Sequence, residues 1–169
     1  MKSVDVANCI IDRYGADVVL TNLKLNELVY FTQVCSLRET GNPLFDDAIE
    51  AEENGATVPA VYRAFQKYGR NRIRQFSPYE NSERLQRIVA LTMDKIGRLT
   101  AYDLVQLSRR DGGAWKKAYA PNKDNPITAE IITSSTDMTA FENIGRTLRD
   151  GFDMVAEKWP NTMRLLENS

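Results

Sequence analysis

The residues best suited to chemistry are carboxylates in the first third of the chain: Asp46, Asp47, Glu50, Glu52 and Glu53. Carboxylate oxygens are the ligands that hard cations such as Mg²⁺ and Ca²⁺ prefer. The spacing is not that of an EF-hand loop, and nothing beside the group supplies a general base of tuned pKa. Because runs of charge are commonly solvated surface, we expect an acidic loop. A metal-dependent enzyme is the alternative.

A second group is basic and interleaved with aromatic residues. It consists of Lys67, Arg70, Arg72 and Arg74, flanked by Tyr68, Phe76 and Tyr79. Such a mixture suits phosphate contacts and base stacking. The chain as a whole carries a net charge of −1, however, so it is not a polycation of the kind that binds nucleic acid in bulk. We expect a surface connector or a patch for an acidic partner, with a nucleic-acid-binding regulator as the alternative.

The composition excludes several catalytic classes. The 169 residues contain no histidine, so the chain alone cannot form a Ser-His-Asp or Cys-His centre. Its two cysteines, Cys9 and Cys35, are too few for an all-cysteine zinc or iron–sulfur site. Both lie on apolar helical patterns, and we expect them to be reduced core residues. We expect no cofactor and no bound metal, and the composition favours a binding protein over an enzyme.

Helical spacing of apolar residues runs through most of the chain. A first helix is predicted from a Ser3 cap to Gly15, and a second from a Thr21 cap to Gly41. The second is apolar nearly all round, which predicts a central helix buried on several sides. Residues 43–58 break the period, and Asn54-Gly55 is a turn signal, so a short β-hairpin is expected there, with an ordered loop as the alternative.

Later helices are predicted from their caps and stops. Pro59 suits a first helical position, and Ser77-Pro78-Tyr79-Glu80 resembles a capping box that would start a helix ending at Gly97. Thr100 opens a short helix, Gly112-Gly113 breaks it, and a last helix is predicted over about 137–159.

The fold class is therefore mainly α, with one domain over 1–160 and a tail over 161–169. The first residues do not have the pattern of a signal peptide and no apolar run reaches the ~20 residues of a membrane span, so we expect a cytoplasmic protein with no membrane partner.

Residues 21–69 contain short sequence motifs that are specific enough to indicate a protein family. The motif residues are Lys24-Leu25, Leu28 to Tyr30, Gln33, Thr40-Gly41, Pro43 to Phe45, Ile49 to Ala51, Gly55, Val58-Pro59, Val61-Tyr62, Phe65 and Tyr68-Gly69. Asp5 to Asn8, Leu99 to Leu107 and Gly113 to Tyr119 extend the pattern. In these motifs the chain resembles the Panacea (SocA-like, phage-associated) antitoxin domain family over about residues 4–132.

Some positions depart from the family pattern. Glu52 replaces a tryptophan, Gly55-Ala56 replaces Gly-Pro, and Glu27 replaces the lysine before the Leu-Leu-Tyr motif. A histidine common before the Gly-Pro-Trp motif is replaced near Ser108 to Asp111. Any chemistry carried by those positions would be lost here, which fits a packing and binding role.

The resemblance implies a non-enzymatic antitoxin that neutralises a toxin encoded next door by direct binding. One branch of the family delivers its toxin to the ClpXP protease, so a proteolytic adaptor is the alternative. Some members carry an added DNA-binding domain, but no helix-turn-helix module is evident here. The toxin, the binding face and the oligomeric state are left open.

Partner-binding candidates follow from residue type. The aromatic candidates are Tyr30, Phe31, Tyr62, Tyr68 and Trp115, and the basic ones are Lys24, Arg63, Lys67, Arg70, Arg72 and Arg74. Large aromatic residues anchor interfaces inside a polar rim. Aromatic residues at helical spacing are also typical of a core, and the sequence does not separate the two roles.

Overall fold

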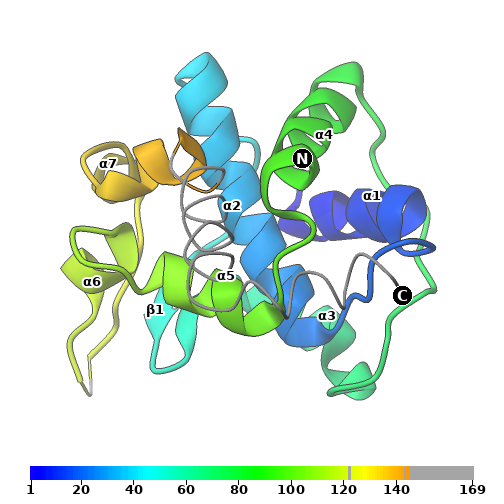
Figure 1. Cartoon of the computed structure of the whole chain (residues 1–169), viewed down its shortest axis with the longest axis horizontal. Helices are drawn as coiled ribbons and strands as arrows, with labels where there is room; N and C mark the ends of the chain where they lie inside the picture. The colour runs from blue at the N-terminus through cyan, green and yellow to red at the C-terminus, as the bar shows by residue number, and fades with distance from the viewer. Residues whose placement is uncertain (122, 143, 145–169) are drawn as a thin grey trace, which may run out of the picture.

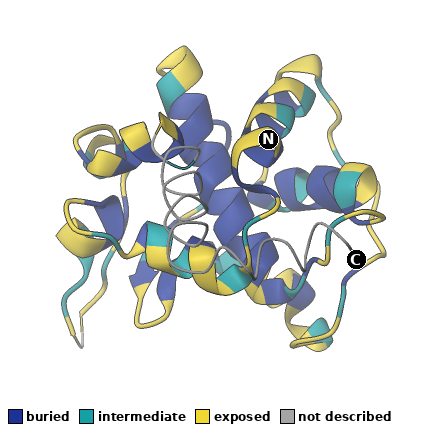
Figure 2. Ribbon diagram, in the orientation of Figure 1, coloured by how far each residue is buried: buried dark blue, intermediate teal, exposed yellow. Residues whose placement is uncertain are grey.

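Helix α2, Asn22–Thr40, is the axis of the molecule (Figure 1). The computed structural model describes residues 1–121, 123–142 and 144. The Thr21 side chain accepts a hydrogen bond from the Lys24 N–H, and Gly41, at φ 70°, ends the helix in the left-handed conformation. Both ends lie where the sequence predicts them. Figure 2 shows α2 buried along most of its length, which confirms the prediction of a central helix.

The other helices pack around this axis. Helices α1 (Ser3–Tyr14), α3 (Pro59–Phe65), α4 (Glu83–Ile96) and α5 (Ala101–Ser108) all contact α2. The short helices α6 (Ala114–Ala118) and α7 (Ala129–Thr133) and the 3₁₀ turns η1 (Gln66–Tyr68) and η2 (Thr136–Thr139) complete the described part. The fold is mainly α, as predicted.

A two-stranded antiparallel hairpin lies beside the lower half of α2 in Figure 1. Strands β1 (Glu50–Glu52) and β2 (Gly55–Thr57) pair with Glu50 opposite Thr57 and Glu52 opposite Gly55. The predicted hairpin is confirmed. Its turn residues are Glu53 and Asn54, one position earlier than the Asn54-Gly55 signal, because Gly55 is the first residue of the second strand.

The start of α1 differs from the prediction. Lys2, not Ser3, occupies the N-cap position. Ser3 is buried, and its N–H and hydroxyl both donate to Asp47 Oδ2 at 2.6 Å. A carboxylate from a distant loop thus satisfies a donor that a local cap was expected to satisfy.

The predicted start of α4 at Ser77 to Glu80 is wrong. The helix begins at Glu83, and the Ser82 side chain accepts from the Leu85 N–H. Residues 72–82 have no regular secondary structure and lie against α1, because tertiary contacts hold them there. The Ser77 N–H donates to Asn8 Oδ1 at 3.0 Å, and the Tyr79 hydroxyl donates to Asp12 Oδ2 at 2.8 Å.

Two further predictions, the cap of α5 and the burial of the two cysteines, are confirmed. Thr100 caps α5 in a capping box with Asp103, as predicted. Cys9 and Cys35 are buried free thiols, which confirms their assignment to the core.

Helix α7 was not predicted. The predicted helix over 137–159 begins at η2, and its part from residue 145 onward lies outside the described residues, as does the tail. None of the helices described is long and apolar enough to cross a membrane.

Candidate partner-binding site

The structure separates the candidate residues into buried and exposed groups, with Tyr68 and Arg72 half-buried between them. Tyr30 and Phe31 have no exposed area, Trp115 is buried, and Lys24 donates through Nζ to the Gly97 carbonyl at 3.0 Å. These four side chains are therefore engaged inside the fold. Tyr62, Arg63, Lys67, Arg70 and Arg74 are exposed.

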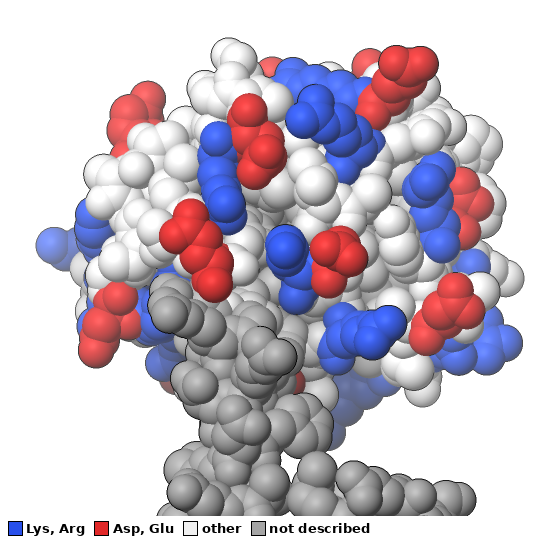
Figure 3. All heavy atoms as spheres, turned by 45° about the horizontal axis from the view of Figure 1, so that its top comes forward, with Lys and Arg blue, Asp and Glu red and all other residues white. Residues whose placement is uncertain are grey.

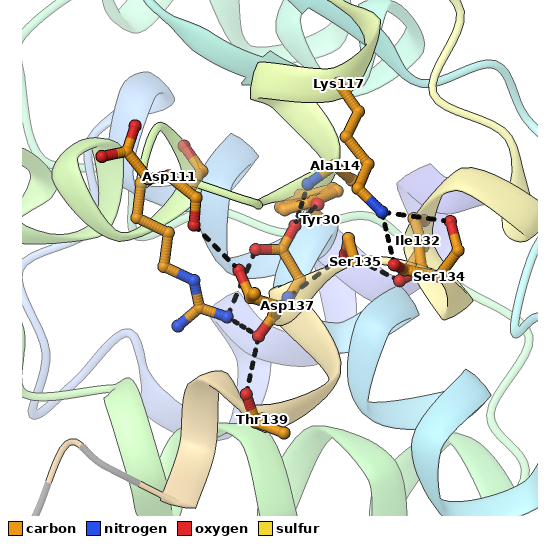
Figure 4. Close-up of polar contacts among 12 residues, drawn as sticks. Tyr30, Asp111, Ala114, Lys117, Ile132, Ser134, Ser135, Asp137 and Thr139 are labelled. Atoms are coloured by element: carbon orange, nitrogen blue, oxygen red, sulfur yellow. Dashed lines mark hydrogen bonds and ion pairs between the residues drawn. The ribbon is translucent and has the colours of Figure 1, made fainter.

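Tyr30 takes part in a buried junction centred on Asp137 (Figure 4). The Tyr30 hydroxyl donates to Asp137 Oδ2, which also accepts from the Ala114 N–H at 3.0 Å. Arg110 Nη2 lies 3.4 Å from Asp137 Oδ1. A fully buried carboxylate with these partners joins η2 to α2 and to the start of α6, and its role is structural.

Trp115 ties α6 to the hairpin. Its indole Nε1–H donates to the Glu52 carbonyl at 2.7 Å. The ring stacks on Tyr119 with centroids 4.6 Å apart, and the Arg109 guanidinium lies 4.7 Å from the Trp115 ring centroid. Trp115 thus positions the strand carrying Glu50 and Glu52.

Within the basic stretch, Arg72 and Lys67 make contacts inside the protein, whereas Arg70 and Arg74 are exposed. Arg72 donates through Nη2 to the carbonyls of Gly15 and Ala16, at 2.8 and 2.6 Å, so it holds the α1–α2 connection. Lys67 lies 5.1 Å from the Tyr68 ring centroid on η1. Arg70 and Arg74 are exposed. Figure 3 shows basic and acidic side chains intermingled over the face it presents.

Tyr62 and Arg63 line a pocket formed where α2, the hairpin and α3 meet. Its volume is about 430 Å³. Leu23, Pro59 and Tyr62 provide apolar surface on its wall. Leu23 and Tyr62 are 45% and 51% exposed, although large apolar side chains usually avoid water.

Acidic side chains also line this pocket. Glu50 and Glu52 lie two residues apart on β1 and so face the same side of the hairpin. Glu27, on α2, is only 1% exposed. The site therefore combines apolar walls with negative charge, and Arg63 is the one basic lining residue among those described.

Glu27 has few polar contacts for a buried acid. Ser108 donates through Oγ to Glu27 Oε1 at 3.2 Å, and Oε2 has no hydrogen-bond partner among the described residues. Burial raises the pKa of Glu27 well above its ordinary value; the hydrogen bond from Ser108 opposes this and the charge of Asp137 adds to it. The sequence marked Glu27 only as a departure from the family pattern. Its role could have been suspected because a glutamate on the buried face of an apolar helix is rare.

The acidic cluster does not come together as one centre. Asp47 is engaged with Ser3, whereas Glu50 and Glu52 face the pocket. Across residues 1–121, 123–142 and 144, no group of three or more potential ligands is arranged to hold a metal ion.

Comparisons with known proteins concern the same region. The family described as "Antitoxin SocA-like, Panacea domain" matches residues 25–116. A curated protein of Caulobacter vibrioides (strain NA1000 / CB15N), Antitoxin SocA, is 35% identical over 138 residues, which cover 68% of this chain and 70% of the relative. No solved structure gives a significant match.

Proposed function

Because the chain belongs to the SocA-like Panacea antitoxin family, we propose that it is a cytoplasmic antitoxin that neutralises its cognate toxin by binding it directly. The family match confirms the resemblance identified from the sequence. The mode of action proposed is non-catalytic: the antitoxin covers a surface that the toxin needs.

The observation that carries the proposal is where the family match falls. Residues 25–116 include Glu27, the hairpin and α3, which form most of the pocket lining. Leu23 and Tyr62, both exposed, form part of its wall, and apolar or aromatic side chains inside a polar rim are typical of protein interfaces. Among the partner-binding candidates, we therefore assign the anchoring role to Tyr62 and a rim role to Arg63.

The test is co-expression with the adjacent small open reading frame. We expect the neighbouring product to arrest growth alone, this chain to restore growth, and the two to co-purify as a stable complex. A harmless neighbour that does not co-purify would overturn the proposal.

A matched experiment tests the mode of action. The same co-expression in a ClpXP-deficient host should still restore growth, because neutralisation by binding needs no protease. Rescue that is lost in that host, with no stable complex, would replace direct neutralisation by delivery of the toxin to the protease.

A further inference from the structure

Glu27 has no counter-charge among the residues that the structure describes. No lysine or arginine in the described part of the chain lies within ion-pairing distance of its carboxylate. A buried acid with one unpartnered oxygen is costly, because a buried polar atom without a hydrogen bond loses its hydration and gains nothing in return. A partner for Oε2 can come from outside the chain, because Glu27 lines an open pocket.

The pocket is suited to one kind of side chain. Long basic side chains have an apolar stem and a charged head. Leu23, Pro59 and Tyr62 offer apolar contact for a stem, and Glu50 and Glu52 surround the approach to Glu27 with negative charge. Aromatic faces such as that of Tyr62 also attract cations.

We propose that this pocket receives a lysine or arginine side chain of the toxin, whose charged head pairs with Glu27 Oε2. The inference rests on the proposed function, since the cation belongs to the partner that this chain neutralises. It names the chemistry of the anchor: an aliphatic stem against Leu23 and Tyr62, and a charge-assisted hydrogen bond to Glu27. Specificity follows, because a partner that presents an acidic or short polar residue here would leave Glu27 unpaired.

Proton linkage supports the same assignment. A cation beside Oε2 favours the ionised acid, whereas burial in the free protein favours the neutral one. The charge of Asp137 also opposes ionisation of Glu27, whereas the hydrogen bond from Ser108 favours it; the other charged groups that line the pocket are Glu50, Glu52 and Arg63. Complex formation should therefore release protons from Glu27 at any pH where the free carboxyl is still protonated, and affinity should rise with pH until the free carboxyl is ionised.

The experiment compares Glu27→Gln with wild type in titration calorimetry against the purified toxin. Gln keeps an acceptor for Ser108 and removes the charge. We expect binding to weaken about tenfold or more, because a buried charge pair is lost. Measured in buffers of different ionisation enthalpy, wild-type binding should release up to one proton and the variant's binding none.

Controls separate the possible outcomes. Glu83→Gln makes the same change at an exposed residue at the start of α4, away from the pocket, and should bind as wild type. The double variant Glu50→Gln/Glu52→Gln, which leaves Glu27 in place, should also slow association in a salt-sensitive way. In the toxin, one lysine or arginine changed to methionine should weaken binding non-additively with Glu27→Gln.

Three results would overturn the inference while the proposed function stands: unchanged binding by Glu27→Gln, an equal loss in Glu83→Gln, or additivity with every basic residue of the toxin. Glu27→Gln that destabilises the free protein at neutral pH would also overturn it, since that result would mean that a cation of this chain already pairs with Glu27. If the wild-type chain neither rescues growth nor binds, the proposed function itself fails.

Discussion

Gly55 lies against the carboxylate of Glu27: a β-carbon at position 55 would stand 2.5 Å from Glu27 Oε1 and 3.2 Å from Ser108 Oγ. Gly55 also adopts φ 132°, a conformation that side-chain-bearing residues rarely take. The glycine therefore brings the hairpin backbone directly onto the buried acid, so that the shape of the pocket and the position of Glu27 depend on each other.

Gly55→Ala tests this dependence. The β-carbon must displace the Glu27 carboxylate and the backbone must accept a strained conformation, so we expect a loss of about 1–3 kcal/mol in unfolding free energy. Chemical denaturation measures it. Gly41→Ala, at φ 70° with no atom within 4 Å of its β-carbon, carries only the conformational cost. An equal loss in both variants would contradict a close contact at Gly55.

Glu27→Gln should stabilise the free protein at neutral pH. The unfolded chain ionises Glu27 near its ordinary pKa of 4.5, whereas burial keeps the folded form protonated to higher pH. At a pH between the pKa of Glu27 in the unfolded chain and its raised pKa in the folded protein, the folded state binds more protons than the unfolded state. The free energy of unfolding of the wild type therefore falls as the pH rises through this range. Melting curves should show a higher Tm for the variant at about pH 8 and a shrinking difference toward about pH 4. A difference that is independent of pH would count against this account.

Tyr62→Ala should weaken toxin binding about ten- to hundredfold, as expected for an aromatic anchor. Its Tm should stay close to wild type, because the side chain is half exposed. Tyr102→Ala is the matched control: Tyr102 is 70% exposed on α5 and does not line the pocket. Equal losses of affinity in the two variants would remove Tyr62 from the anchoring role.

Asp137→Asn should lower stability by about 2–4 kcal/mol, because the Tyr30 hydroxyl, the Ala114 N–H and the Arg110 guanidinium share a fully buried charged acceptor. Equilibrium unfolding measures the loss. Asp111→Asn changes an exposed carboxylate next to Arg110 in the chain and should leave stability unchanged.

In the basic stretch, Arg72 should matter for stability, whereas the exposed Arg70 and Arg74 should not. Arg72→Ala removes two hydrogen bonds to the carbonyls of Gly15 and Ala16, and we expect a loss of about 1–3 kcal/mol in unfolding free energy. Arg70→Ala and Arg74→Ala should leave stability unchanged. A gel-shift assay on folded Arg70→Ala/Arg74→Ala then tests the nucleic-acid alternative: salt-dependent binding lost in that variant would support it.

Local patterns predicted the helices that local residues define. The ends of α2 at Thr21 and Gly41 were predicted correctly because both capping residues are next to the helix in the sequence. The turn residues near Asn54 located the hairpin to within one residue. The predicted helix start at Ser77 was wrong because Asn8 and Asp12, far away in the chain, hold that segment against α1 outside the helix. The cap of α1 was misplaced for the same reason, since Asp47 provides the acceptor.

The candidate site was only partly predictable. Residue type selected Tyr62 and Arg63, but it equally selected Tyr30, Phe31 and Trp115, whose burial depends on packing among α2, α6 and η2. Glu27 was not selected as a site residue, because its importance lies in a missing partner. Such an absence is visible only when the surrounding elements have been placed.

The pocket is held together by bonds to backbone atoms. The Asn26 side chain accepts from the Val58 N–H at 2.8 Å and donates to the Val58 carbonyl at 3.1 Å, and Asn22 donates to the Tyr62 carbonyl at 3.1 Å. Trp115 holds the backbone of β1 in the same manner. The side chains at positions 23, 50, 52 and 62 take no part in these bonds. Positions 23 and 52 also lie outside the motifs that the chain shares with its family, so they are free to vary during evolution, and one scaffold can change its partner by drift at a few exposed residues while its architecture persists.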